Sequence, residues 1–514
     1  MTGIEEWVDD RFGPFSAAVG NVIFYSLPLG DDLTLPLIVV WLIAGGLVFS
    51  VYFGLPQLRY IPLAIKIIRG KYTRGDEPGE VTHFQALTSA VSGTVGLGNI
   101  AGVAVAVSQG GPGATFWMIL AGLISMCTKF VECTLGVKYR EIHEDGSVTG
   151  GPFRYLRVAF AKFGDSVPAQ LLSKFLVGFF AVAILLFGMA GGNMFQANQT
   201  FAQVRNVTGG EDGLFGSSLA TLLFGLALAA LVGAVIIGGI KSIGAVTGRL
   251  VPAMAIFYVI ACLTVIALNV GQVPAAIGAI FAGAFSPEGV AGGVLGALIV
   301  GFRRAAFSNE AGVGSAPTAH AAVKTDHPVT EGFVAMLEPF VDTVLICTMT
   351  ALTIIIANPA SYVAARESVA AGGAPPSNEA GVIITSDAFA VVAPWFPYLL
   401  VVAVALFAFS TLVTWSYYSL KAWTTLFGRS KISETVFKLF YLFFTVVGTL
   451  ITLGSVLDFA DSMLFACALV NIFGLYLLMP VVKDEVRKFV GGIKSGDITE
   501  VKNPQSLIHP GQKN

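Results

Sequence analysis

The sequence predicts an all-α polytopic membrane protein with eleven transmembrane helices. Hydrophobic residues make up 55% of the 514 positions and charged residues 12%, and the mean hydropathy is +0.77, which is typical of membrane proteins with many spans. Windows of about 20 apolar residues, the length that crosses a bilayer, recur along the chain. One window is interrupted by the glycine-rich stretch from Ser92 to Asn99. Glycine weakens a helix, so such a break is expected only inside the protein or beside a watery cavity.

The apolar windows divide the chain into five parts. An extracytoplasmic N-terminal segment, residues 1–34, precedes an accessory transmembrane helix at 35–54. The first five-helix repeat covers 84–270, the second covers 275–481, and a cytoplasmic tail covers 482–514. The predicted spans are 35–54, 84–108, 113–137, 174–203, 215–239, 248–270, 275–302, 333–357, 387–420, 435–455 and 459–481.

Lysine and arginine are distributed unevenly between alternate loops. With the N-terminus outside, 26 of the 30 basic residues lie in cytoplasmic segments, three lie outside, and Lys129 lies within a span. Cytoplasmic loops normally carry the excess of basic residues, and one missed crossing would invert every later loop. The asymmetry therefore predicts a multi-pass protein of the plasma or inner membrane, with the N-terminus outside and the C-terminus in the cytoplasm.

A second interruption is predicted five spans after the first, between Phe285 and Gly296. Interrupted spans at matching positions of two halves are typical of the inverted repeats of secondary transporters. The spacing predicts an accessory first helix followed by a five-plus-five inverted-repeat core with two broken helices. The alternative is that the glycines only allow close helix packing.

The first break offers groups for both an anion and a cation. Unwinding leaves amides at the start of one half-helix and carbonyls at the end of the other. The amides are candidates for a substrate carboxylate, and the carbonyls and one side-chain oxygen are candidates for sodium, a hard cation that prefers oxygen ligands. The carboxylate candidates are Gly96, Leu97 and Gly98, and the sodium candidates are Thr94, Val95 and Asn99.

Two further spans carry polar residues suited to such a site. In the span 387–420, Ser410 and Thr411 offer hydroxyls that complete a sodium cage opposite Val95, and Trp415 is a candidate wall for the substrate. The alternative for the hydroxyls is bonding within their own helix. In the span 174–203, Gln196 is a candidate substrate ligand and Phe195 an apolar lining residue. The alternative there is hydrogen bonding between helices or an outer vestibule.

Charged residues near the inner ends of the spans are candidates for a gate. Lys129 and Glu132 lie in one span at i, i+3 spacing, close enough to pair. The run after the predicted seventh span contains Arg303, Arg304 and Glu310, which are candidate partners for them. The alternatives are a proton relay through the first pair and a solvated cytoplasmic turn for the run.

Other classes of function find little support in the sequence. The five cysteines lie in apolar segments without metal-type spacing, and the five histidines lie at span ends, in loops or in the tail. An intramembrane enzyme is therefore a remote alternative, as is a channel. The net charge of −2 argues against a nucleic-acid partner. We expect no cofactor other than a coupling ion.

Four motifs resemble the alanine or glycine:cation symporter family of bacteria and archaea. They are Ser92–Asn99, Gly110–Met118, Phe307–Pro317, and Phe340–Thr343 with Cys347 and Thr348, within a resemblance that covers about 35–485. The resemblance implies a leucine-transporter-type fold and import of small neutral amino acids with sodium, sometimes with protons. It also implies roles for single residues. These are substrate contacts for Gln196, Thr411 and Trp415, one sodium site with Val95, Ser410 and Thr411, and a substrate-adjacent sodium site with Thr94 and Asn99.

The leading hypothesis is a sodium-coupled symporter that imports alanine and glycine through the bilayer by alternating access. Trp415, Phe195 and Gln196 leave room for a methyl or hydrogen side chain more readily than for a larger one. The alternative of the same fold is a proton-coupled symporter or exchanger that uses Glu132. A monomer is sufficient for either mechanism.

Overall fold

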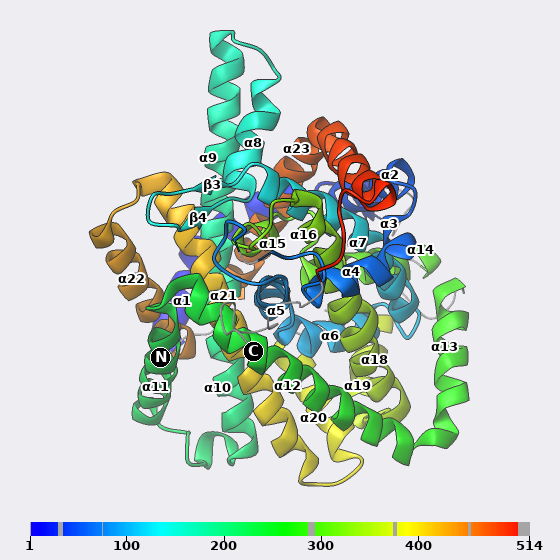
Figure 1. Ribbon diagram of the computed structural model, residues 1–514. Coiled ribbons are helices and arrows are strands. Elements are labelled where there is room, and N and C mark those ends of the chain that lie inside the picture. Colours follow the sequence, from blue (N-terminus) through cyan, green and yellow to red (C-terminus); the bar gives the residue numbers. More distant parts are fainter. Residues whose placement is uncertain are drawn as a thin grey trace.

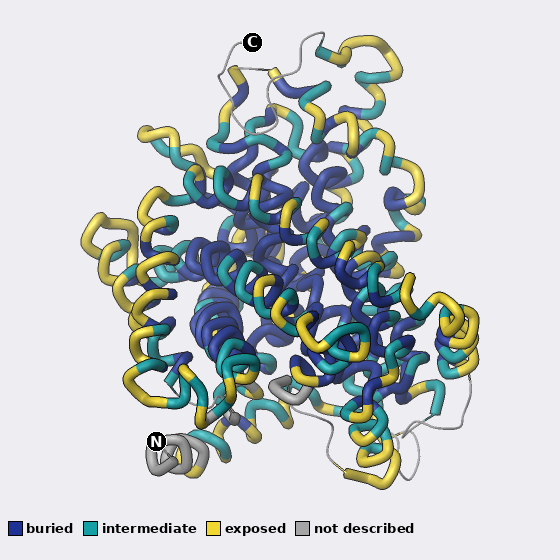
Figure 2. Tube along the Cα trace, turned by 90° about the horizontal axis from the view of Figure 1, so that it is seen from below, coloured by how far each residue is buried: buried dark blue, intermediate teal, exposed yellow. Residues whose placement is uncertain are grey.

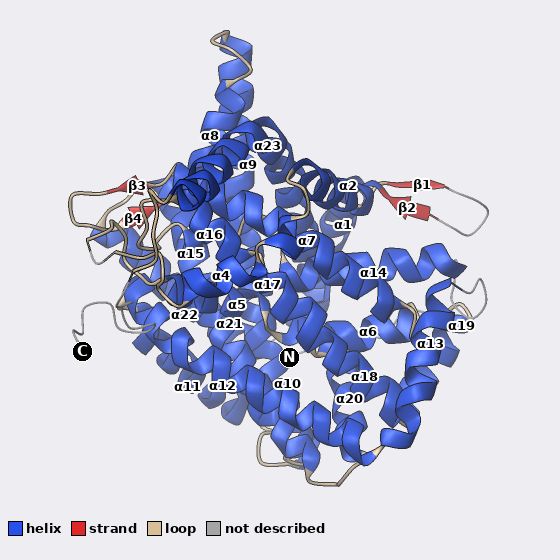
Figure 3. Cartoon of the chain, turned by 45° about the vertical axis from the view of Figure 1, so that its right-hand side comes forward, coloured by secondary structure: helices blue, strands red, loops and turns tan. Residues whose placement is uncertain are grey.

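The computed structural model describes residues 2–28, 34–74, 76–285, 293–373, 378–450 and 454–501. This part of the chain is a bundle of helices (Figure 1). Two small antiparallel hairpins lie at opposite edges of it (Figure 3). In one, β1 (Ser26–Pro28) pairs with β2 (Thr34–Pro36), and in the other, β3 (Glu141–Ile142) pairs with β4 (Val148–Thr149).

The helices follow one another with short connections. In the first part of the chain they are α1 (Thr2–Ile23), α2 (Leu37–Tyr52), α3 (Pro56–Arg59), α4 (Ile61–Ile68), α5 (His83–Thr94), the 3₁₀ turn η1 (Leu97–Asn99), α6 (Ala101–Gln109), α7 (Ala114–Lys138), α8 (Pro152–Ala161), α9 (Val167–Met189), the π-helix η2 (Ala190–Met194), α10 (Phe195–Val207), η3 (Gly210–Asp212), α11 (Ser218–Ile236), α12 (Gly239–Leu268), η4 (Val270–Gln272) and α13 (Val273–Phe285). The second part contains α14 (Gly293–Asn309), α15 (Ala316–His320), α16 (Pro328–Ala335), α17 (Leu337–Pro339), the π-helix η5 (Phe340–Cys347), α18 (Thr348–Ala357), α19 (Ala360–Ala370), α20 (Asn378–Ala390), α21 (Phe396–Phe427), α22 (Lys431–Leu450) and α23 (Gly454–Ser495).

Eight helices of the described chain are long and apolar enough to cross a membrane. The count is nine if the bent pair α5 and η1–α6 forms one span. The apolar helix α2 is shorter than these spans, and α14 contains two arginines. The multi-pass, all-α architecture is therefore confirmed, while the count of eleven and the orientation of the termini stay predictions.

The first predicted break is present. Helix α5 ends at Thr94 and the chain bends by 60° before it continues through η1 into α6. A capping box fixes the other end of α5, because the Thr82 side chain accepts a hydrogen bond from the Gln85 amide and the Gln85 side chain reciprocates. The half-helix α5 is therefore defined at both ends.

A second break lies after the predicted one. Residues 286–292, the centre of the predicted break, lie outside the described residues. Within the described chain, α14 stops at Asn309 and α15 starts at Ala316. The link between them contains left-handed backbone at Glu310, Gly312 and Gly314, which ends a helix because this conformation cannot continue it. The run that was a candidate for a solvated turn is thus a buried helix break.

The two breaks divide the long helices evenly. The spans α7, α9–α10, α11 and α12 follow the first break, and the spans α16–α18, α21, α22 and α23 follow the second. A broken helix followed by four long ones, twice over, is the pattern that a five-plus-five core predicts.

The described helices add detail to two predicted segments. In the window 275–302, which is predicted to be interrupted, α13 ends at Phe285 and α14 begins at Gly293. Helix α23 continues to Ser495 and therefore includes the start of the predicted tail, since its amphipathic last turns pack on the bundle through residues such as Phe489.

Helix α21 runs through the centre of the bundle, where it packs against α5, α9, α10 and α12. Figure 2 shows buried residues gathered at the centre and exposed residues around the rim. Helix α7 packs against α14 and α16, and α15 packs against both α7 and α5. Both breaks are therefore enclosed by helices.

Candidate functional site

The side chain of Asn99 stabilises the non-helical backbone of the first break. Gly96 has extended backbone, and its amide donates to the Asn99 Oδ1 atom at 2.9 Å. In this conformation the Gly96 amide is therefore not available to a substrate carboxylate, which was its predicted ligand, because it already donates to Asn99. Within the described chain, the amides of Leu97 and Gly98 have no hydrogen-bond acceptor, so they remain candidates for an anion.

Helix α21 lies directly against the broken segment. The Thr411 hydroxyl donates to the Ser92 carbonyl at 3.1 Å, and the Ser410 hydroxyl lies 3.5 Å from the same oxygen. Both hydroxyls also bond the Phe407 carbonyl of their own helix. The predicted approach of these hydroxyls to α5 is thus present, but they meet the carbonyl of Ser92 rather than that of Val95.

The Trp415 side chain forms a wall between two helices. Its indole N–H donates to the Gly93 carbonyl at 3.3 Å. On its other side it packs on η2, where a methyl group added at Gly192 would lie 2.4 Å from the indole ring. Phe187 meets the same ring at 4.7 Å between centroids. Glycine in η2 therefore lets α21 approach closely.

Gln196 follows directly after η2 and faces the break. A methyl group added at Gly96 would lie 3.4 Å from Gln196 Oε1 and 2.8 Å from Thr411 Oγ1. The Gln196 amide donates to the Gly191 carbonyl at 3.2 Å, whereas its buried Oε1 has no hydrogen-bond partner in the described chain. An unpaired acceptor of this kind suits a ligand N–H group. The structure thus brings Gly96, Gln196 and Thr411 together.

The apolar candidates are buried in the same region. Phe195 precedes Gln196 and is 2% exposed, and Leu97 is fully buried. A methyl group at Gly98 would lie 3.6 Å from the Phe307 ring of α14. The first break is therefore in contact with the half-helix that precedes the second break.

A buried carboxylate lies beside the first break. Asp342, in η5, accepts hydrogen bonds from Asn99 Nδ2 at 2.6 Å, the Ser308 hydroxyl at 2.7 Å and the Thr343 hydroxyl at 2.8 Å. In the described chain no lysine, arginine or histidine lies within 4.0 Å of it. An ionised carboxylate inside a membrane protein normally has a cationic partner.

The oxygen atoms around Asp342 match the preference of a hard cation. The group combines a carboxylate and two hydroxyls from two segments, η5 and α14, and no cluster of three metal-binding His, Cys, Asp or Glu exists among the described residues. Such a set suits sodium or a proton better than a transition metal. Of the predicted sodium ligands in the first break, Thr94 is the last residue of α5 and is buried, as is Val95 after it.

A chain of charged side chains crosses the bundle away from this site. Lys129 lies 3.1 Å from Glu338 and 3.8 Å from Glu132, and all three are fully buried. Glu132 also accepts from Asn471 of α23 at 3.0 Å. The predicted pairing of Lys129 with Glu132 is therefore present, although its closer partner is Glu338.

The same chain extends to the first broken helix. His320 of α15 lies 2.5 Å from Glu331 and 3.8 Å from Glu338. His83, in the first turn of α5, contacts the second oxygen of Glu331. Acidic and basic groups thus alternate from α7 to α5, and each acidic group joins two helices.

The remaining gate candidates separate in the structure. Glu310 lies in the second break and accepts from the Ser315 hydroxyl at 2.5 Å. Arg303 lies instead over the Phe24 ring at 4.5 Å, in a cavity that also contains Asp458 and Asp461 of α23. Arg303 and Arg304 are therefore not in a cytoplasmic turn, because α14 continues past them to Asn309.

The sequence analysis missed several residues of these two groups. Asp342, Glu331 and Glu338 are carboxylates within or next to a predicted span, and the rule that singled out Lys129 applies to them equally. His83 and His320 were set aside because they lie at span ends. Only the three-dimensional contact shows that Glu331 joins them.

Comparison with known proteins gives concordant matches. The model of the sodium:alanine symporter family matches residues 27–503. The chain is 36% identical over 457 residues to the sodium/alanine symporter AgcS of Methanococcus maripaludis, covering 88% of this chain and 94% of that protein. It is 31% identical over 469 residues to the probable sodium/glutamine symporter GlnT of Bacillus subtilis, covering 91% and 90%.

Among solved structures, the fold is similar to that of MhsT in complex with L-phenylalanine. The TM-score is 0.53 at 15% sequence identity, covering 77% of this chain and 89% of that chain. At this identity the likeness concerns the fold alone, and it confirms the predicted leucine-transporter-type architecture.

Proposed function

Because the chain belongs to the sodium:alanine symporter family, we propose that it imports alanine and glycine by alternating access, with sodium as the coupling ion. Membership of this family makes the chain a multi-pass membrane symporter of amino acids rather than an enzyme. The choice of substrate and of coupling ion, and inward transport, are the further steps of the proposal.

The observation that carries the proposal is the convergence of two helices, α10 and α21, on Gly96 in the first break. The Gln196 and Thr411 oxygens both lie within 3.4 Å of the position that a Gly96 methyl group would take. The space beside Gly96 is therefore small and lined by acceptors. This arrangement supports a substrate with an ammonium group and a short side chain. The relative GlnT is named for a larger substrate, glutamine, so substrate size is a point to test.

Asp342 supports coupling to a cation. Its three hydrogen-bond donors are neutral, so a bound sodium ion would supply the missing positive charge. Since Asn99 bonds both Asp342 and the Gly96 amide, a cation here would act on the same segment that borders the substrate. Inward movement of one charge through 100 mV contributes about 2.3 kcal/mol to uptake. A proton would also neutralise Asp342, and this keeps a proton-coupled symporter or exchanger as the second candidate.

Transport in proteoliposomes separates the two candidates. We expect uptake of radiolabelled alanine under an inward sodium gradient at equal pH, and none above background under a pH gradient without sodium. Vesicles without gradients and vesicles without protein are the controls. Uptake that is unaffected by sodium and driven by pH would exclude the sodium mechanism. Competition by unlabelled glycine, alanine, glutamine and leucine would then rank the substrates by size.

Exchange of Asp342 for asparagine tests the cation site directly. Asp342→Asn keeps the shape and removes the charge, so we expect the sodium concentration for half-maximal alanine uptake to rise at least about tenfold, because the site loses its attraction for a cation. The matched control is Asp387→Asn, which removes the same charge from α20. An unchanged sodium dependence in a folded Asp342→Asn protein would argue against a role for Asp342 in coupling.

A further inference from the structure

A cavity on the bundle's surface has no part in the transport site. It has a volume of about 580 Å³ and lies between α8, α9 and the last turn of α21. Its walls include the apolar side chains of Phe160, Val177 and Leu426, and its charged lining residues include Arg157 and Lys174. The helices α8 and α9 project beyond the rest of the bundle here (Figure 1).

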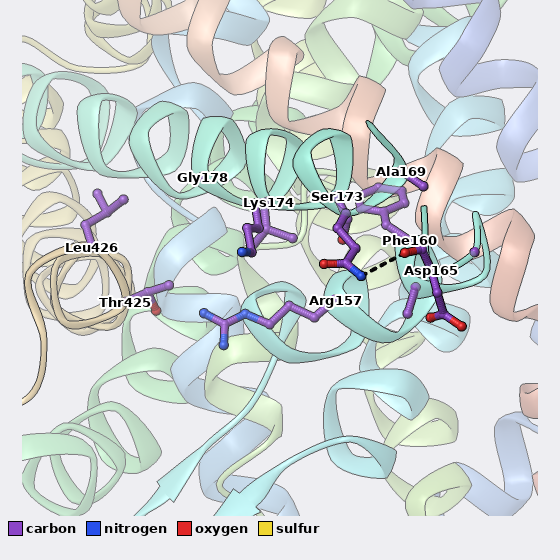
Figure 4. A pocket seen from close by; sticks show the side chains of 13 residues that line it. Arg157, Phe160, Asp165, Ala169, Ser173, Lys174, Gly178, Thr425 and Leu426 are labelled. Atoms are coloured by element: carbon purple, nitrogen blue, oxygen red, sulfur yellow. Dashed lines mark hydrogen bonds between the residues drawn. The ribbon is translucent and has the colours of Figure 1, made fainter. Parts of the chain in front are cut away.

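The two cations of this cavity are directed to the same region. In Figure 4 the Arg157 guanidinium and the Lys174 ammonium group both point toward the end of α21, where Thr425 and Leu426 lie, and Asp165 lies at the opposite end. Within the described chain no carboxylate is within 4.0 Å of either cation. Asp165, the acidic residue of the lining, is thus not in ion-pair contact with the two cations, which face the α21 end of the cavity without a paired carboxylate.

Neighbouring basic residues differ in this respect. Arg154, one turn earlier on α8, pairs with Glu141. Lys162 donates to the Leu477 carbonyl at 2.6 Å, and Arg429 pairs with Asp145 at 2.9 Å. The C-terminal residues 502–514 contain no aspartate or glutamate. Among the described residues, Arg157 and Lys174 thus have no ion-pair partner and can receive an anion from outside the chain.

The surroundings of the cavity indicate what that group is. On α9, Leu171 is 60% exposed and Phe175 is 64% exposed, on the helix that then continues as a long apolar span. Lys174 lies at the first residue of the span that the sequence predicts. A pair of cations at the edge of the apolar layer, above an apolar cleft, matches a lipid with an anionic headgroup and acyl chains.

We propose that this cavity binds an anionic phospholipid, with its phosphate between Arg157 and Lys174 and an acyl chain along Val177 and Leu426. The phosphate accepts hydrogen bonds from both cations. Because α8 and α9 belong to the first repeat and α21 to the second, the lipid joins the two repeats at one end of the bundle. The proposal does not depend on the identity of the transported substrate.

Native mass spectrometry of the purified full chain tests this site. The probe is phosphatidylglycerol, and phosphatidylethanolamine is the zwitterionic comparison. For the variant Arg157→Gln/Lys174→Gln we expect the affinity for phosphatidylglycerol to fall about 30-fold, since each cation near a membrane surface contributes about fivefold. The matched control is Lys241→Gln/Lys431→Gln, which removes the same charge outside the cavity, and its affinity should change less than twofold.

Three results would overturn the proposal. Equal losses in the two double variants would show attraction by the general surface charge rather than by a site. Equal binding of the two lipids to the unmodified protein would exclude recognition of the anionic headgroup. If inorganic phosphate raised the thermal unfolding midpoint of the protein as much as phosphatidylglycerol does, the ligand would be a free anion. Arg157 and Lys174 are exposed, so their exchange should not affect folding. An unfolding midpoint of the lipid-free double variant equal to that of the unmodified protein is the check.

A photoreactive phosphatidylglycerol locates the bound lipid independently. We expect crosslinked peptides from 157–178 or 425–426 in the unmodified chain, and their loss in Arg157→Gln/Lys174→Gln but not in the matched control. Crosslinks confined to other faces of the bundle would contradict the assignment.

Discussion

At the residue scale, Gly96 sets the size of the candidate substrate site. Its backbone is extended, with φ −139° and ψ −150°, so alanine fits the conformation and the added methyl group itself is the perturbation. That methyl group would lie 2.8 Å from the Thr411 hydroxyl, a distance that requires the hydroxyl to move. The position is therefore suited to a test of site volume without backbone strain.

Gly96→Ala should weaken alanine binding about 10- to 200-fold, the range for one methyl group too many in a close-fitting pocket. The measurement is equilibrium binding to purified protein in the presence of sodium. Gly102→Ala on α6 is the control, because nothing lies within 4 Å of the added methyl group there. Unchanged binding by Gly96→Ala would place the substrate elsewhere.

The first break was largely predictable from residues, and its hydrogen bonds were not. The glycines between Ser92 and Asn99, the hydroxyls of Ser410 and Thr411, and the amide of Gln196 are visible as polar groups in apolar windows. Which acceptor each hydroxyl meets depends on the helix rotation, so the preference for Ser92 over Val95 appears only in the structure. Asn99 was expected as a sodium ligand, and its bond to the Gly96 amide gives it a structural role as well.

At the element scale, Lys129 holds α7 against α17. Its ammonium group lies between Glu338 and Glu132 in a fully buried position. Removal of one partner from a buried ion pair leaves an uncompensated charge, which typically costs about 3–5 kcal/mol. The pair is thus a measurable connection between the two repeats.

Lys129→Met should lower the thermal unfolding midpoint in detergent, and Lys129→Met/Glu338→Gln should recover part of the loss because one of the stranded charges is also gone. The double-mutant cycle gives the coupling energy. Lys438→Met, at a half-buried position of α22 outside this contact, is the control. If the effects of Lys129→Met and Glu338→Gln on the free energy of unfolding were additive in the double variant, the contact between the two side chains would contribute no coupling energy.

The second break shows why element boundaries were harder to predict than their existence. The glycine-rich run 289–296 and the run 310–315 both follow the expected pattern of an interrupted span. The structure shows a break at the second run, where Glu310 itself has left-handed backbone. Sequence alone gives no reason to expect this conformation at a glutamate, because only tertiary contacts such as its bond to Ser315 hold it there.

At the scale of the whole molecule, the alternating charges connect the parts that alternating access would separate. His83 is in the half-helix α5, and its partner Glu331 is in α16, which packs on α7. His320 joins the same glutamate from α15, the half-helix after the second break. One carboxylate therefore holds both half-helices in the present arrangement.

Glu331→Gln should loosen α5 at this end. In a background without native cysteines, Thr88→Cys on α5 should react about tenfold faster with a methanethiosulfonate reagent when Glu331→Gln is present, since a charged hydrogen bond contributes about 1.5–3 kcal/mol. Thr88 is 4% exposed in the structure. The control is Asp326→Asn in the neighbouring loop. Equal labelling rates for Thr88→Cys alone, with Glu331→Gln and with Asp326→Asn would show that Glu331 does not hold α5 in place.

The π-helices η2 and η5 have a consequence for how this site tolerates changes in chain length. A π turn contains one residue more than an α turn and usually marks a single-residue insertion in a helix. Loss of one residue from Ala190–Met194 would restore an ordinary α-helix there and leave the rest of α9 and α10 in register. Loss of one residue elsewhere in α10 would rotate all that follows by about 100°. A residue can therefore be gained or lost during evolution in η2, next to Gln196, or in η5, which contains Asp342, with the least disturbance of the surrounding helix packing.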